Sequence, residues 1–163
     1  MMRMARCVIL LILVSGAIST LAKAQALERQ FAVITNPKNT VGSISSRQLR
    51  KLLLGEDKFW ESHTPVYLIL RDGSSPEGQF AMKQIASMSP ADYRQYWNAK
   101  VFRGEATEQP LIVPSNGLAS GLVASRVGSI CIIPAANVPK DASVKLLRVD
   151  GKLPGESGYP LRQ

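Results

Sequence analysis

The run Val66-Tyr67-Leu68-Ile69-Leu70 passes directly into Arg71-Asp72-Gly73-Ser74-Ser75-Pro76-Glu77-Gly78, and this stretch decides the fold. The first run predicts a buried strand, because a short, almost wholly apolar segment next to turn residues is typical of a covered sheet. The Gly/Ser segment predicts a turn, after which Pro76 suits the first helical position and Ser75 can cap the helix. One stripe of that helix is apolar and holds Ala81, Ile85 and Met88.

The alternation of strands and helices extends to both sides of this stretch. We expect helices to begin at Ser45 and Ser89, which can act as N-caps, and after Ser115. Further strands are expected at 31–35, 111–113, 130–133 and 144–149. Strands separated by helices predict an α/β fold with a mostly parallel sheet and helices on both faces. In such sheets ligands bind where the carboxyl ends of strands meet the N-termini of helices.

The length and composition fit one folded domain. The chain has 163 residues, of which 45% are hydrophobic and 20% are charged. This balance can bury a core and excludes an intrinsically disordered chain, a collagen and a coiled coil. The formal net charge is +8, but the basic residues are dispersed, and the local cluster of Arg47, Arg50 and Lys51 fits a solvated helix face. We therefore expect no nucleic-acid partner.

The N-terminus has the pattern of a secretory signal peptide. Two arginines precede the apolar run Cys7–Ile18, and Ala22-Lys23-Ala24 follows as a cleavage site with small residues. The run is shorter than the ~20 residues that a membrane-spanning helix needs. We expect residues 1–24 to be the signal peptide and residues 25–163 to be one periplasmic-binding-protein-like domain, exported to the periplasm without stable membrane insertion.

The sequence offers little for catalysis or metal binding. Cys131 is the only cysteine after the signal peptide, so no intrachain disulfide can form, and its apolar neighbours indicate a buried side chain. His63 is the only histidine, which excludes the usual Cys/His zinc sites, and there is no calcium-binding loop. A Ser-His-Asp site would need His63, whose neighbour Ser62 lacks the GxSxG context of a nucleophile. We expect no enzyme activity, no cofactor and no metal.

The segment Arg71–Gly78 is the strongest candidate for a binding site. It brings backbone N–H groups, hydroxyl groups and the positive end of a helix dipole together, which favours an anion such as phosphate or sulfate. Arg71 would add a forked, charge-assisted contact. A structural interpretation is also open, in which Ser75 caps its own helix and Arg71 pairs with a carboxylate.

Three segments of the chain carry a family resemblance. The first is a strand followed by a serine-started helix that ends in Leu53-Leu54-Gly55, with Trp60 nearby. The second, Leu70–Ser75, is similar to an R-x-D-G-S-G-T motif, and the third, Arg126–Cys131, is similar to a PGAIGY motif. In their order and spacing, over residues 31–149, they resemble the phosphate-binding proteins of high-affinity phosphate ABC transporters, within the type II periplasmic-binding-protein-like superfamily.

The resemblance implies site residues and a partner. Arg71 and Ser75 stand at the family's arginine and second serine, which bind phosphate, and Ser74 and the amide of Gly73 are their neighbours. The implied ligand is therefore a small oxyanion such as phosphate, held by Arg71, Gly73, Ser74 and Ser75. The implied partner is a membrane transporter. Full-length members have two lobes, whereas the mature chain fits a single lobe.

Two departures from the family motivate an alternative hypothesis. Pro76 stands where the family has a glycine and removes an amide donor, and Glu77 replaces a threonine and would repel phosphate. The leading hypothesis is an exported solute-binding protein. The alternative is a periplasmic interaction or sensory module that contacts a membrane receptor, transporter or sensor without binding phosphate. An exported hydrolase acting through His63 is the third class.

Overall fold

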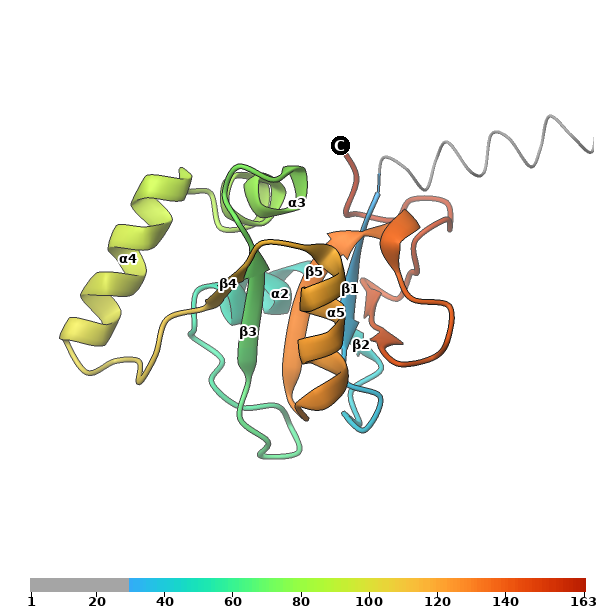
Figure 1. The fold of residues 1–163 in the computed structure, drawn as a ribbon, viewed down its shortest axis with the longest axis horizontal. Coiled ribbons are helices and arrows are strands. Elements are labelled where there is room, and N and C mark those ends of the chain that lie inside the picture. Colours follow the sequence, from blue (N-terminus) through green and yellow to red (C-terminus); the bar gives the residue numbers. More distant parts are fainter. Residues whose placement is uncertain (1–29) are drawn as a thin grey trace, which may run out of the picture.

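Figure 1 shows the computed structural model of the chain, which describes residues 30–163. The predicted signal peptide, residues 1–24, and the first residues of the predicted mature domain lie outside the described residues. Among residues 30–163, no helix has both the length and the apolar character needed to span a bilayer.

A central sheet organises the described part of the chain (Figure 1). In spatial order its five strands are β4 (Leu111–Val113), β3 (Tyr67–Arg71), β5 (Ser129–Pro134), β1 (Phe31–Thr35) and β6 (Lys145–Leu146). β3 pairs in parallel with β4 and β5, whereas β1 pairs antiparallel with β5 and β6. Within the described residues, four strands thus share one direction and β1 runs against them, which confirms the predicted mostly parallel sheet.

The strand expected at 144–149 is divided between two sheets. β6 joins the central sheet, and β7 (Arg148–Val149) pairs in parallel with the short strand β2 (Ser43–Ile44). Leu147 lies between β6 and β7, is fully buried, and donates its amide to the carbonyl of Val33 at 2.9 Å. The chain therefore changes sheets at Leu147 without leaving the core.

In the described part of the chain, four helices begin directly after a serine. They are α2 (Ser46–Leu53), α3 (Pro76–Gln79), α4 (Pro90–Phe102) and α5 (Asn116–Ser125). In each case the serine Oγ accepts a hydrogen bond from the amide three residues further on, which satisfies a free N–H group of the first turn. The predicted caps Ser45, Ser75 and Ser89 are confirmed, and Ser115 acts in the same way. A 3₁₀ turn at Ala135–Asn137 follows β5.

The helix that begins with α3 changes its geometry after one turn. It continues as a π-helical segment, η1 (Phe80–Ile85), next to which the amide of Ala86 donates to the carbonyl of Ala81. Ser87 then adopts a φ of 61°, a left-handed conformation that a helix cannot continue through. The prediction of one regular helix that includes Met88 is therefore wrong at its end, because Met88 lies beyond this reversal.

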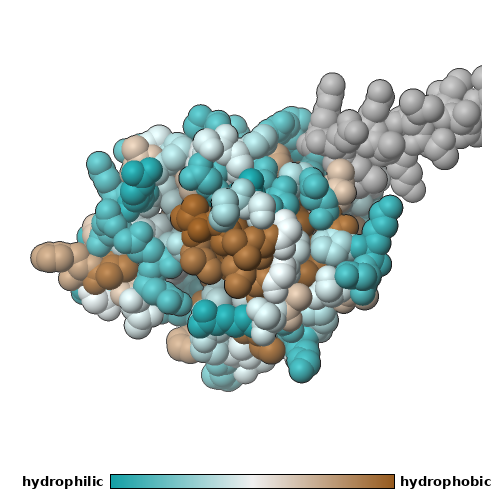
Figure 2. Space-filling view, in the orientation of Figure 1, coloured by the Kyte–Doolittle hydropathy of each residue, from teal (hydrophilic) through white to brown (hydrophobic). Residues whose placement is uncertain are grey.

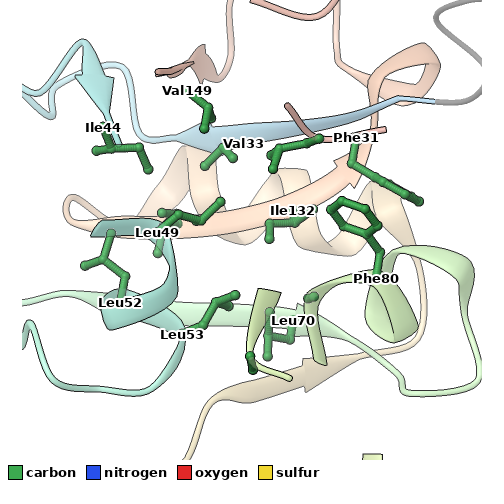
Figure 3. Packing of buried hydrophobic residues seen from close by; sticks show 14 of the residues in the cluster. Phe31, Val33, Ile44, Leu49, Leu52, Leu53, Leu70, Phe80, Ile132 and Val149 are labelled. Carbon is green, nitrogen blue, oxygen red and sulfur yellow. The ribbon is translucent and has the colours of Figure 1, made fainter. Parts of the chain in front are cut away.

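Helices cover both faces of the sheet, as predicted, and each face has its own hydrophobic core. Figure 1 shows α5 crossing one face, with α2 behind the other. Val33 and Ile132 point toward α2 and η1 (Figure 3), whereas their neighbours Ile34 and Ile133 point toward α5. This division follows from the alternation of side chains along a strand. Burying each such side chain contributes about 1.5–3 kcal/mol.

Candidate functional site

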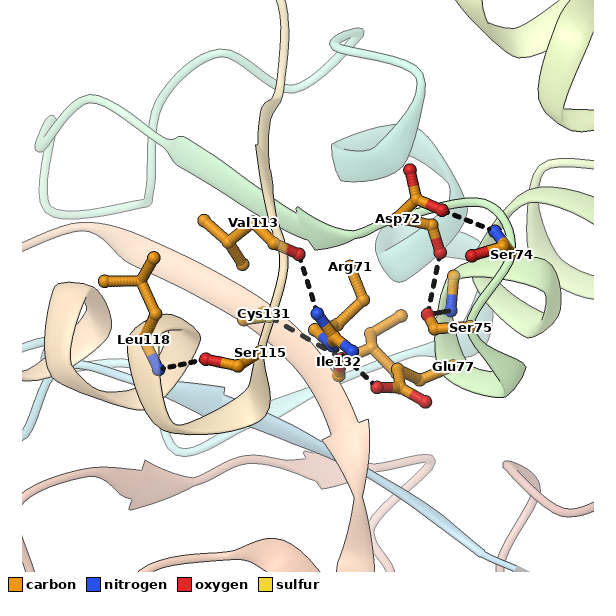
Figure 4. A network of polar contacts seen from close by, with 11 residues as sticks. Arg71, Asp72, Ser74, Ser75, Glu77, Val113, Ser115, Leu118, Cys131 and Ile132 are labelled. Atoms are coloured by element: carbon orange, nitrogen blue, oxygen red, sulfur yellow. Dashed lines mark hydrogen bonds and ion pairs between the residues drawn. The ribbon is translucent and has the colours of Figure 1, made fainter.

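The predicted site lies where β3 leaves the sheet (Figure 4). Arg71 is the last residue of β3, and Gly73, Ser74 and Ser75 connect it to α3. β3 lies between β4 and β5, and Arg71 is in register with Val113, the last residue of β4. The four predicted residues therefore lie at the carboxyl end of neighbouring parallel strands, the position at which α/β sheets bind ligands.

Arg71 is held by other groups of the protein (Figure 4). Its Nε donates to Oε1 of Glu77 at 2.8 Å, and its Nη1 donates to the carbonyl of Val113 at 2.8 Å. The side chains of Arg71 and Glu77 are only 13% and 4% exposed. A protein carboxylate thus makes the charge-assisted contact that an oxyanion would make with this guanidinium. The structure favours the structural interpretation of Arg71.

Ser75 is also engaged within the turn. Its Oγ accepts a hydrogen bond from the amide of Gly78 at 3.1 Å and donates to the carbonyl of Asp72 at 2.7 Å. Its own amide donates to the same carbonyl at 2.9 Å. These bonds close the turn and cap α3, so the hydroxyl and the amide of Ser75 already have protein partners.

Gly73 and Ser74, by contrast, line an open cavity of about 530 Å³. The cavity lies between the connection from β3 to α3, the helix α4 and the start of β4. Its apolar wall consists of Met82, Pro90, Tyr93, Trp97, Pro110 and Ile112. Its other lining residues have polar or charged side chains and are Asp72, Arg94 and Gln109. The volume and the mixed lining are typical of a small-molecule site.

The helix α4 is held beside this cavity by hydrogen bonds to the end of α2. Tyr93, Tyr96 and Lys100 each donate to the backbone carbonyl of Leu53 or Leu54, at 2.6, 2.8 and 3.0 Å. Burial raises the pKa of Tyr93, so its hydroxyl remains a neutral donor. These bonds fix the orientation of α4, and therefore also the positions of the α4 residues that line the cavity.

Two opposite charges line the cavity without pairing. Neither Asp72 nor Arg94 forms an ion pair with another residue in the described range 30–163. The amide of Ser74 donates to Oδ1 of Asp72 at 2.8 Å, and hydrogen bonding from Ser74, aided by the nearby arginines, lowers the pKa of Asp72. Asp72 is therefore ionised at neutral pH. Sequence reasoning missed Arg94, because only the packing of α4 on the end of α2 brings it to the cavity.

His63 and Cys131 lie away from this site. His63 is an exposed turn residue with a φ of 59°. Cys131 is fully buried in β5, and burial raises the pKa of its thiol to about 12, so the thiol stays protonated. Within residues 30–163, no group of three or more His, Cys, Asp or Glu side chains could hold a metal ion.

Comparison with known proteins concerns the fold. Neither a protein-family model nor a curated protein matches the sequence. Solved structures that match include an ABC-type phosphate transport receptor from Vibrio cholerae, at 19% sequence identity and a TM-score of 0.52. PstS from Borrelia burgdorferi matches at 20% sequence identity and a TM-score of 0.57. A candidate phosphate ABC transporter substrate-binding protein with bound phosphate, from Clostridium perfringens, matches at 20% sequence identity and a TM-score of 0.61.

These matches cover 77–78% of this chain and 47–49% of the other chains, so the chain spans about half of their length. The chain has a single-lobe form of the periplasmic-binding-protein fold. The fold expected from the family resemblance is therefore confirmed. Within this lobe, Gly73 and Ser74 face an open cavity, whereas Arg71 and Ser75 hold the turn that carries them.

Proposed function

We propose that this protein is an exported, non-enzymatic solute-binding module whose ligand is a small molecule with an oxyanion group. The observation that carries the proposal is the cavity beside the turn from β3 to α3, which Gly73 and Ser74 line together with the unpaired Arg94. The fold supports it, since the matching structures are phosphate transport receptors and substrate-binding proteins. By analogy, we propose the periplasm as the location and a membrane transporter as the partner.

The residues of the site have two different roles in this proposal. Arg94 supplies the positive charge to the oxyanion, and Gly73 and Ser74 form the adjoining wall. Arg71 and Ser75 shape that wall from behind, because they tie the turn to α3 and β4. Phosphate bound directly on Arg71 and Ser75, as the family resemblance implies, would require the carboxylate of Glu77 to move away.

Isothermal titration of the purified protein tests the proposal. The probes are phosphate, sulfate and 3-phenylpropionate, and we expect saturable heat with at least one of them. Arg94→Gln should weaken that binding by about tenfold or more, because a charge-assisted hydrogen bond is lost. Arg103→Gln is the matched control: Arg103 directly follows the last residue of α4, pairs with Glu105 and does not line the cavity. No heat from the folded protein, or equal binding by Arg94→Gln, would contradict the proposal.

An exposed apolar surface favours a second candidate function, the partner-binding module. Figure 2 shows hydrophobic residues gathered near the middle of the face that carries α5 and β4. Leu111 and Ile112 of the edge strand β4, and Leu118 of α5, are 46–51% exposed. Large exposed apolar side chains that lie together often mark a protein interface. Leu118→Lys should then abolish capture of a membrane transporter or sensor and leave binding of the small-molecule probes unchanged.

A further inference from the structure

We propose that the cavity beside Gly73 and Ser74 binds a free α-amino acid with an apolar side chain. The inference rests on the proposed solute-binding function and names the class of solute. It follows from two features of the cavity: two opposite charges that do not pair with each other or with another residue of the described chain, and an apolar wall.

The two charges match the two ends of an amino acid. Asp72 and Arg94 line the same cavity, and neither forms an ion pair with a residue of the described chain, including the other. The amide of Ser74 donates to Oδ1 of Asp72 at 2.8 Å and orients this carboxylate. A zwitterion can place its ammonium group at Asp72 and its carboxylate at Arg94. Both residues are exposed, so a simple anion or a simple amine would gain one of these contacts and meet a screened repulsion from the other charge.

The apolar wall matches a hydrophobic side chain. Met82, Tyr93, Trp97 and Ile112 line the cavity from α4, η1 and β4. Ile112 is 46% exposed, which is high for a large apolar side chain, and a ligand would cover it. Inorganic phosphate or sulfate would gain nothing from this wall. The volume of about 530 Å³ leaves room for an aliphatic or aromatic side chain.

Isothermal titration calorimetry with L-phenylalanine and L-leucine tests the inference. The comparison ligands are 3-phenylpropionate, which lacks the ammonium group, 2-phenylethylamine, which lacks the carboxylate, and glycine, which lacks the side chain. We expect L-phenylalanine or L-leucine to bind at least about tenfold more tightly than each comparison ligand, because each of these lacks one of the three contacts. Circular dichroism confirms that each variant is folded.

Two substitutions assign the contacts. Asp72→Asn should remove the preference for L-phenylalanine over 3-phenylpropionate, and Arg94→Gln should remove its preference over 2-phenylethylamine. Arg103→Gln should change neither preference. If phosphate or 3-phenylpropionate binds as tightly as the amino acids, this inference is wrong and the proposed oxyanion-binding function stands. If the folded protein binds none of the probes, both are wrong.

Discussion

Arg71 and Glu77 face each other in a nearly closed environment, and their contact determines what the turn after β3 can bind. Removing two charges from water is expensive, and the ion pair, together with the bond from Arg71 to the carbonyl of Val113, offsets part of that cost. Pro76 fits the same arrangement, since it occupies the first position of α3, where no amide donor is needed. Pro76 and Glu77 are the residues that depart from the phosphate-binding motif. Pro76 removes an amide donor and Glu77 occupies the guanidinium of Arg71, so both oppose phosphate binding at this turn.

The substitution Glu77→Gln tests the structural role of this pair. It keeps the size of the side chain but leaves Arg71 without its ionic partner, so we expect the free energy of unfolding to fall by about 1–3 kcal/mol. Urea denaturation measures the change. Glu105→Gln is the control, because the pair of Arg103 and Glu105 is about half exposed and its loss should cost no more than about 0.5 kcal/mol. Equal costs for the two variants would show that the Arg71 pair contributes little.

The same variant tests whether Glu77 closes the predicted phosphate site. Once the carboxylate is neutralised, the guanidinium of Arg71 has no anionic partner within hydrogen-bond distance. We expect added phosphate to raise the melting temperature of Glu77→Gln by more than that of the wild type, since ligand binding stabilises the folded state and the variant gains a contact on Arg71. The double variant Glu77→Gln/Arg71→Gln should lose the effect. A wild-type protein stabilised by phosphate in the same way would contradict this role of Glu77.

At the scale of helices and strands, local chemistry was sufficient for some predictions. The serines at the helix starts act within three residues of themselves, so Ser45, Ser75 and Ser89 could be predicted without tertiary information. The direction of β1 could not be predicted in this way, because β1 is paired with strands about a hundred residues away. The π-helical geometry of η1 and the reversal at Ser87 also lack a clear local signal.

Two helical glycines show how packing overrides helix propensity. A Cβ at Gly78 in α3 would lie 2.1 Å from the carbonyl oxygen of Asp72, whereas a Cβ at Gly121 in α5 would meet nothing within 4 Å. We expect Gly78→Ala to lower the free energy of unfolding by about 2 kcal/mol or more, because backbone atoms must shift. Gly121→Ala should raise it by about 0.5–1 kcal/mol. Urea denaturation of both variants measures the difference, and a stabilising Gly78→Ala would mean that α3 is not packed this closely against the turn.

For the molecule as a whole, the candidate site shows the limit of sequence reasoning. Arg71, Gly73, Ser74 and Ser75 are neighbours in sequence, and their place at the end of β3 followed from the strand and turn pattern. The opposite wall of the cavity comes from α4 and β4, and Arg94 and Trp97 reach it only through the packing of α4 on the end of α2. Tyr93 and Trp97 are buried, and an apolar pattern on a helix indicates such burial without revealing the cavity beside it.

The C-terminal segment is part of the whole fold, although its Gly/Pro-rich sequence lies beyond the family resemblance. Tyr159 and Leu161 are 1% and 4% exposed and belong to the core beneath α2. The amide of Phe31 donates to the carbonyl of Leu161 at 2.9 Å, which attaches the segment to the start of β1. The last residues of the chain therefore close the core over the first strand.

Tyr159 tests this closure, because its ring and its hydroxyl should have opposite effects. The ring is fully buried, so Tyr159→Ala should lower the free energy of unfolding by about 3–5 kcal/mol. The hydroxyl is buried without a hydrogen-bond partner among the described residues, so Tyr159→Phe should leave the stability unchanged or raise it by up to about 1 kcal/mol. Tyr93→Phe is the matched control: it loses the bond to the carbonyl of Leu53 at 2.6 Å and should cost about 1–3 kcal/mol. Urea denaturation compares the three variants, and a Tyr159→Phe protein as unstable as Tyr93→Phe would show that the Tyr159 hydroxyl is hydrogen-bonded after all.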